Sequence, residues 1–350
     1  MHLLCLARAI AVSVLPLFFI DSAAAGQQTN QSAQVPQSTA TSSSDGLVLD
    51  RAKENLSSLS IKDSQLHAEL PLLGEKGERP EFTRELLQVR WRPNDPIDLY
   101  VIRPRGVKKP PVVLYLYGYP SDTDRFKDAG YCARVVRHGV AAVGFVSALT
   151  GHRTEHRSPK EWFVGNLQES IVETVHDVQM ILNYLETRGD LDMNRVGIFG
   201  EGSGGAIAIL AATADHRIKT LDLLRPWGDW QDWLATSDLI PQEQRPAFLK
   251  PDFLKRLEPL EPVRFLPELK GQSIRIQIVD SETDTKKSLA KLESVAPSSA
   301  KIVHYRDSLE FRKAASDGHV FDWLAVELNG AKQETTSPQS ATKSAALPTN

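Results

Sequence analysis

The stretch that decides the fold of this chain is Arg195–Gly205, RVGIFGEGSGG. Its apolar part, residues 196–199, predicts a short buried strand, and the small apolar residues 206–212 predict a helix. The glycines between them predict a tight turn, because glycine adopts backbone conformations that strain other residues. The sequence therefore predicts a strand that turns sharply into a helix, with one serine, Ser203, in the turn.

The composition is that of an ordinary globular protein, with 41% hydrophobic and 24% charged residues. The 350 residues have room for one large α/β domain or two small ones. A formal net charge of −3 argues against nucleic acid or an anionic membrane surface as the main partner.

The two ends of the chain are expected to lie outside the folded part. Residues 1–25 predict a signal peptide, because a short apolar run precedes three alanines that offer a cleavage site before Gly26. We therefore expect a secreted or periplasmic protein with no integral membrane association after cleavage; a retained anchor is the alternative. Residues 26–48 and 331–350 are polar and predict a disordered linker and tail.

Residues 49–330 show strands alternating with helices. Strands are expected at residues 86–91, 97–102, 111–116, 140–145, 196–199, 218–224, 274–279 and 301–305, and helices at 166–188, after the turn, and at 320–328. The first two strands predict a hairpin, and Gly189 is expected to end the first helix. The alternation predicts an α/β fold with a mostly parallel sheet and helices on both faces. Residues 231–271, interrupted by prolines, predict a small helical cap insertion.

Four segments make residues 80–330 resemble the α/β-hydrolase superfamily. They are the loop Leu116–Pro120, the turn at residues 200–204, the segment Val279–Asp284 and the segment Asp317–His319. The last three follow one another in the order nucleophile, acid and histidine of that superfamily, and the first resembles its oxyanion loop. The resemblance implies the α/β-hydrolase fold, and secreted esterases and peptidase-like acyl hydrolases are the most similar branch.

The turn departs from the superfamily's Gly-x-Ser-x-Gly pattern by one position, which leaves two alignments. In the first, Gly202 stands at the apex of the turn, Gly200 and Gly204 take the flanking small-residue sites, and the nucleophile is missing. In the second, Ser203 is the nucleophile, but the Glu201 side chain crowds the site before it. We favour the first alignment, because glycine adopts the strained conformation of the apex without penalty.

The resemblance implies roles for further residues. In the first alignment the backbone N–H groups of Ser203 and Tyr119 form the oxyanion hole, and the Ser203 hydroxyl caps the following helix. His319 is the general base, and Asp284 fixes its tautomer; Asp229 is an alternative acid or a turn residue. We expect His319 and Asp284 to hydrogen-bond at the carboxyl edge of the sheet, where they would polarise a water if no serine is present.

Other residues suggest less specific roles. The closely spaced Trp227, Trp230 and Trp233 predict either a substrate pocket or packing of the cap. Cys132, the only cysteine left after cleavage, is expected to be a buried apolar residue. Residues 151–157 hold two histidines and a glutamate but no second ligand cluster, which indicates a solvated polar loop. No metal and no cofactor is expected.

The leading interpretation is an exported hydrolase of carboxylic-ester or related acyl substrates whose serine is displaced or missing. The alternative is a catalytically inactive α/β-hydrolase-fold protein that binds a small molecule or a partner in the same pocket. In the first alignment a serine-directed fluorophosphonate is expected to label the protein weakly or not at all, and Gly202→Ser is expected to gain labelling.

Overall fold

The computed structural model describes residues 54–61, 70–93, 95–121, 123–150, 153, 163–282 and 285–334, without the side chains of Phe163, His319 and residues 331–334. The predicted signal peptide, the linker at residues 26–48 and most of the predicted tail lie outside the described residues. Within the described ranges, no helix has both the length and the apolar character needed to cross a bilayer.

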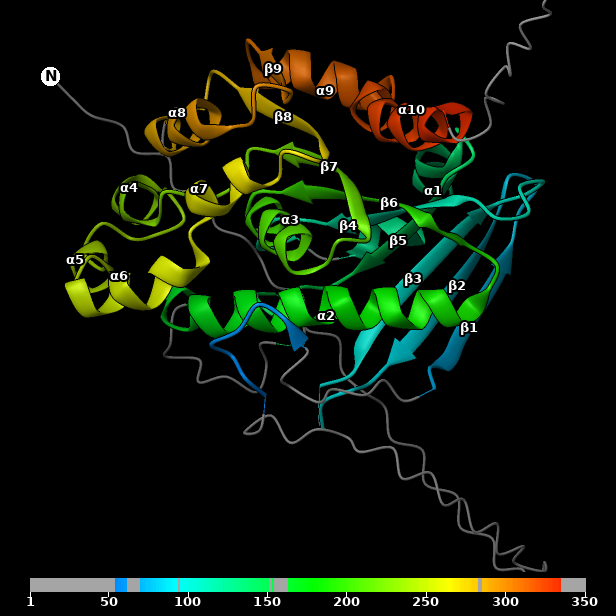
Figure 1. Ribbon diagram of the computed structural model, residues 1–350, viewed down its shortest axis with the longest axis horizontal. Helices are drawn as coiled ribbons and strands as arrows, with labels where there is room; N and C mark the ends of the chain where they lie inside the picture. The colour runs from blue at the N-terminus through cyan, green and yellow to red at the C-terminus, as the bar shows by residue number, and fades with distance from the viewer. Residues whose placement is uncertain are drawn as a thin grey trace, which may run out of the picture. The chain divides into compact units, whose positions relative to one another are not determined.

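The strands of the described residues form one mixed sheet (Figure 1). They are β1 (Leu72–Glu78), β2 (Phe82–Val89), β3 (Ile97–Pro104), β4 (Pro111–Leu116), β5 (Ala141–Phe145), β6 (Asp192–Glu201), β7 (Ile218–Leu224), β8 (Ser273–Val279) and β9 (Lys301–Tyr305). Their order across the sheet is β1-β2-β3-β5-β4-β6-β7-β8-β9. Every pair from β5 to β9 is parallel, whereas β1, β2, β3 and β5 pair antiparallel. The predicted, mostly parallel sheet is confirmed.

Helices cover both faces of this sheet (Figure 1). They are α1 (Ala129–Val136), α2 (Leu167–Arg188), α3 (Ser203–Ala214), α4 (Trp230–Thr236), α5 (Arg245–Phe248), α6 (Pro251–Leu257), α7 (Pro262–Phe265), α8 (Lys286–Val295), α9 (Ser308–Ser316) and α10 (His319–Glu334). The helices α2 and α3 share one core with Leu114 and Val143, and α1 and α10 share another with Val113 and Tyr115. The strands β4 and β5 are apolar throughout because both of their faces are buried.

Several predicted elements have their expected bounds. The strands β4, β7 and β9 begin and end where the apolar runs predict, and α2 ends at Gly189, which has a left-handed φ of 70°. The strand predicted at residues 86–91 instead spans 82–89 as β2. It ends early because Trp91 leaves the sheet and buries its indole against Asp177 on α2, at 2.9 Å from Nε1 to Oδ1.

The sequence pattern does not predict β1, α1, α8 or α9. Strand β1 has mostly exposed residues and no alternation of apolar and polar residues, so only its backbone pairing with β2 makes it a strand. The segment between β7 and β8, which includes residues 231–271, holds the short helices α4 to α7.

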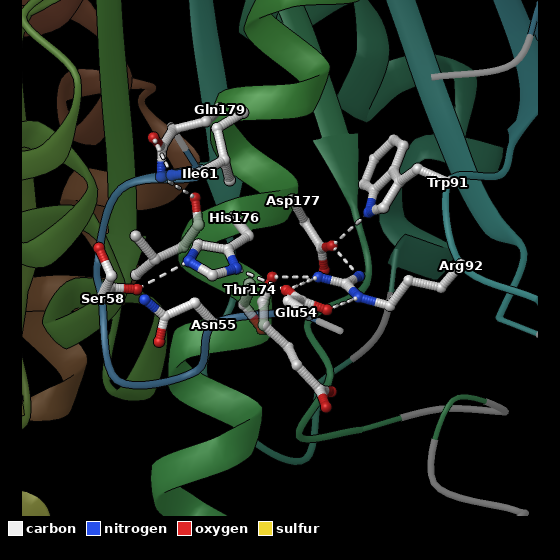
Figure 2. Close-up of polar contacts among 12 residues, drawn as sticks. Glu54, Asn55, Ser58, Ile61, Trp91, Arg92, Thr174, His176, Asp177 and Gln179 are labelled. Atoms are coloured by element: carbon white, nitrogen blue, oxygen red, sulfur yellow. Dashed lines mark hydrogen bonds and ion pairs between the residues drawn. The ribbon is translucent and has the colours of Figure 1, made fainter. Parts of the chain in front are cut away.

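Buried ion pairs hold residues 54–61 against α2 (Figure 2). The Arg92 guanidinium lies between two acids: it donates to both Glu54 oxygens, at 2.6 and 2.7 Å, and to Asp177. Asp177 also accepts a hydrogen bond from Arg153 Nη1 at 2.7 Å. The side chains of these four residues are almost entirely excluded from solvent. We call this cluster, together with Asp95 and His176, the α2 ion network.

His176 joins the α2 ion network through both ring nitrogens. Nδ1 meets the Glu54 carboxylate, and Nε2 lies 2.8 Å from the Ser58 carbonyl oxygen. Burial alone raises the pKa of Glu54, but hydrogen bonds and attraction from Arg92 and His176 outweigh burial and lower it to about 2. Each buried charge thus has a partner of opposite sign, without which its burial would be very costly.

The position of Arg153 corrects one sequence-based expectation. Residues 151–157 were expected to form a solvated loop, which is wrong for Arg153, because its side chain is buried and pairs with Asp95 at 2.8 Å as well as with Asp177. The histidines and the glutamate of that segment lie outside the described residues.

Candidate functional site

Strand β6 turns into helix α3 at a single residue, Gly202. Gly202 has φ 54° and ψ −116°, a positive-φ conformation that costs a residue with a side chain about 1–3 kcal/mol. Its N–H donates to the Leu224 carbonyl at 2.9 Å, and its own carbonyl accepts from Trp227 N–H at 3.0 Å. The residue in the strained part of the turn is therefore Gly202, and Ser203 follows it as the first residue of α3.

The chain around this turn passes too close to itself for side chains. A Cβ on Gly200 would lie 2.5 Å from the Gly204 carbonyl oxygen, and a Cβ on Gly204 would lie 2.2 Å from that of Leu116. A Cβ on Gly118, in the loop after β4, would lie 2.9 Å from the Glu201 carbonyl oxygen. Because these residues have no side chains, the backbone of the turn packs directly against the end of β4 and the loop after it.

Ser203 is fully buried, and its hydroxyl is hydrogen-bonded to the loop after β4. Its Oγ accepts a hydrogen bond from the Tyr119 N–H at 2.9 Å. The expectation that this hydroxyl caps α3 is wrong, because the helix begins at Ser203 itself and Gly202 takes the N-cap position. The Tyr119 amide, expected in an oxyanion hole, is used in this contact with Ser203.

A cavity of about 200 Å³ lies beside the turn, at the carboxyl ends of β6, β7 and β8. We call it the elbow cavity. It is lined by Gly118, Tyr119, Ser121, Glu201, Gly202, Arg225, Trp227, Trp233, Ser237, Leu239, Glu282 and Thr285. Ligands of open α/β sheets bind at this end of the strands, so the elbow cavity is the candidate functional site.

Three charged side chains in the wall of the elbow cavity pair with one another. Arg225 donates to both carboxylate oxygens of Glu282, at 2.5 and 2.6 Å, and to Glu201 Oε1 at 2.7 Å. Arg225 has φ 46°, a strained value for a residue other than glycine. Burial alone lowers the pKa of Arg225, but its two partners outweigh burial and raise it, so the guanidinium stays charged. Two carboxylates thus face one guanidinium in the described wall.

Two of the three clustered tryptophans line the elbow cavity. The rings of Trp227 and Trp233 lie with their centroids 4.2 Å apart. Trp230 is not part of the wall: its Nε1 donates to the Leu260 carbonyl at 2.8 Å, and its ring packs edge-on against Trp233. Trp233 Nε1 is buried, yet no residue that the structure describes offers it a hydrogen-bond acceptor, which is rare for a buried N–H.

The structure does not test the predicted acid and base. Asp284 and the side chain of His319 lie outside the described residues, and so does the predicted hydrogen bond between them. The backbone of His319 begins α10, directly after Gly318 with φ 83°. Asp229, the alternative acid, does not line the elbow cavity; its N–H donates to Glu261 Oε1 at 2.7 Å ahead of α4.

The prediction for Cys132 is confirmed. The thiol is buried, donates to the Phe126 carbonyl at 3.2 Å, and has a pKa raised to about 11 by burial. It is therefore a packed thiol and not a reactive thiolate. In the described part of the chain, no three histidine, cysteine or acidic side chains gather in a way that would hold a metal ion.

Sequence reasoning did not single out Arg225 and Glu282 as site residues. A usable signal existed, because Glu201, Arg225 and Glu282 end or follow the adjacent parallel strands β6, β7 and β8. The carboxyl ends of parallel strands meet at one edge of a sheet, so polar residues at these ends are candidates for a shared site.

Comparisons with known proteins support the fold. No family model matches the sequence, and no curated protein matches it. Among solved structures, an acetyl xylan esterase from Paenibacillus sp. R4 is 16% identical with a TM-score of 0.56, over 73% of this chain and 88% of that chain. Acetyl xylan esterase 1 from Thermoanaerobacterium sp. JW/SL YS485 is 14% identical with a TM-score of 0.55, over 75% and 88%.

A third similar structure is an S-formylglutathione hydrolase from Agrobacterium tumefaciens, which is 15% identical with a TM-score of 0.55, over 73% of this chain and 99% of that chain. At such identities the likeness establishes the fold alone. The chain has the α/β-hydrolase fold, with helices on both faces of a mostly parallel sheet.

Proposed function

We propose that this protein binds an ester or a related acyl compound in the elbow cavity and lacks the covalent serine step of its fold. The observation that carries the proposal is the pair Gly202 and Ser203. The strained turn residue has no side chain, and the neighbouring hydroxyl is fully buried and accepts from Tyr119 N–H. A serine nucleophile needs an exposed hydroxyl next to a general base.

The wall of the elbow cavity supports binding of a neutral, oxygen-bearing molecule. Trp233 lines the cavity, and its buried Nε1 lacks an acceptor among the described residues; we propose that an ester or hydroxyl oxygen of the bound molecule reaches this N–H. The charges of the wall already pair within the protein, which favours a neutral ligand: Arg225 donates to Glu201 and Glu282, and Arg125 Nη1 lies 4.0 Å from Glu201. The similar structures are acetyl xylan esterases and an S-formylglutathione hydrolase, which favours an ester or thioester as the class of ligand.

The test combines a labelling reagent with a binding probe. We expect a fluorophosphonate to leave the protein unlabelled, and we expect phenyl acetate or acetylated xylobiose to change its tryptophan fluorescence saturably without release of acetate above the buffer rate. Trp233→Phe, which removes the unpaired N–H, is expected to weaken this binding. Rapid labelling that Ser203→Ala abolishes would instead identify a serine hydrolase with Ser203 as the nucleophile.

Direct hydrolysis by a water molecule is a second candidate function. It is favoured by the esterase neighbours together with Asp284 and His319, which we propose as the acid and the general base on their order in the sequence. Acetate release that survives Ser203→Ala but is lost in His319→Ala would identify this mechanism.

We also propose that the protein is exported, on the apolar run and the three alanines near the start of the chain. N-terminal sequencing of the protein recovered from the envelope or the medium is expected to begin near Gly26. A mature protein that starts at Met1 contradicts export by cleavage.

A further inference from the structure

An indole lies close to the side of Gly202 where a side chain would stand. A Cβ placed on Gly202 would lie 3.2 Å from Trp227 Nε1 and 3.6 Å from the Cα of Gly118. The first distance is tighter than nine in ten contacts of real Cβ atoms, so Trp227 would have to shift by a few tenths of an ångström.

Trp227 has little freedom to move away. Its backbone N–H donates to the Gly202 carbonyl at 3.0 Å, and its ring packs at 4.2 Å on the fully buried Trp233. Trp233 is held in turn by Trp230, whose Nε1 donates to the Leu260 carbonyl. A shift of the Trp227 indole away from the elbow cavity therefore disturbs the packing of these two rings.

We propose that the Trp227 indole crowds the position where the side chain of a nucleophile at residue 202 would lie. The absence of a serine at residue 202 and the crowding by Trp227 then both prevent formation of a covalent acyl intermediate in the elbow cavity. Trp227 is then a specificity-determining residue: a bound ester meets the edge of an indole where a serine hydroxyl would otherwise stand. This inference rests on the proposed function, because it assigns to Trp227 a part in excluding the covalent serine step. It also revises the expectation for Gly202→Ser, which alone does not restore a usable nucleophile.

A double-mutant cycle on stability tests this coupling without any ligand. The variants are Gly202→Ala, Trp227→Leu and the pair, each compared by thermal unfolding. Gly189→Ala is a reference for a positive φ without crowding, because Gly189 has φ 70° and ψ −4° and no atom within 4 Å of its Cβ position. Backbone strain at Gly202 is the same in both backgrounds, so the cycle isolates the contact with Trp227. We expect Gly202→Ala to lower Tm when residue 227 is tryptophan and to lower it less when residue 227 is leucine.

Equal losses from Gly202→Ala in the tryptophan and leucine backgrounds overturn the proposal. If Trp227→Leu does not fold, Trp227→Phe serves in the same cycle, because it removes Nε1 and reduces the ring. This cycle does not depend on catalysis. Rapid fluorophosphonate labelling of the unaltered protein would therefore overturn the proposed function while leaving the cycle to decide the role of Trp227.

Labelling of serine variants gives a second readout. When a fluorophosphonate labels a serine, the serine oxygen bonds to phosphorus, fluoride leaves, and the hydroxyl proton passes to a base or to water. We expect Gly202→Ser combined with Trp227→Leu to label at least ten-fold faster than Gly202→Ser alone. Equal and measurable labelling of these two variants contradicts the proposal.

Discussion

The elbow cavity and the α2 ion network both combine arginine with acids, but Glu54, Arg92, Arg153 and Asp177 of the network are almost closed to water. In the elbow cavity the side chains of Arg225, Glu201 and Glu282 are 28%, 18% and 33% exposed. In the α2 ion network the side chains of Arg92 and Asp177 are 1% and 0% exposed. The difference separates two uses of charge: partly solvated pairs exchange partners at little cost, whereas a buried charge that loses its partner is strongly destabilising.

The largest expected effect is the loss of Asp177, which accepts hydrogen bonds from Trp91, Arg92 and Arg153. Asp177→Ala is expected to lower the free energy of unfolding by about 3–5 kcal/mol, because it removes one of the anions that two buried guanidinium groups share and leaves Arg92 with Glu54 and Arg153 with Asp95. Urea unfolding of the unaltered protein and of Asp177→Ala at neutral pH measures this loss of stability. The control is Asp124→Ala, which removes an exposed pair with Lys127 and should cost below about 1 kcal/mol. Similar losses for both variants would remove the distinction between the two regions.

Acid should weaken the α2 ion network through Glu54. The pKa of Glu54 is lowered from the ordinary 4.5 to about 2, so its stabilising contribution is complete above about pH 4.5 and is lost as the pH falls through about 2. This lowering of the Glu54 pKa corresponds to a contribution on the order of 3 kcal/mol to the free energy of unfolding. Urea unfolding between pH 5 and pH 2 should show this loss in the unaltered protein and a smaller loss in Glu54→Gln. The same slope in both proteins contradicts the assignment.

Steric closeness at the turn predicts the next effect. Gly204→Ala places a Cβ 2.2 Å from a backbone oxygen that cannot rotate away, and overpacking of this kind typically costs about 1–3 kcal/mol. Gly271→Ala is the control, since nothing lies within 4 Å of its Cβ position. Chemical unfolding of the two variants compares the costs, and an unchanged stability of Gly204→Ala would show that the turn is looser than described.

The smallest expected effect is at the wall of the elbow cavity. Glu282→Gln removes one partner of Arg225 but leaves Glu201 in place at 2.7 Å, so the free energy of unfolding should fall by less than about 1 kcal/mol. A loss as large as that of Asp177→Ala would mean that the charges of the elbow cavity are structural, as those of the α2 ion network are.

The strands β4 and β7 could be predicted from the sequence because their apolar residues report burial on both faces. Helix α2 could be predicted because its apolar residues recur at helical spacing and Gly189 ends it. Strand β1 could not, because its exposed residues carry no pattern and its pairing with β2 depends on a neighbour. At the site, the turn and two of the three tryptophans were within reach of sequence reasoning. The hydrogen bond from Tyr119 to Ser203 was not, because it joins residues 84 positions apart.

The sequence by itself determined the alternation of strands and helices and the glycine-rich turn after β6, because local patterns report burial and backbone freedom. The tertiary structure alone decided where the charges and rings of distant segments meet. Arg92 and Glu54 find each other across 38 residues, and the Trp227 indole comes to lie beside Gly202. Such contacts depend on how the elements pack, and packing is a property of the whole fold that no single stretch of sequence encodes.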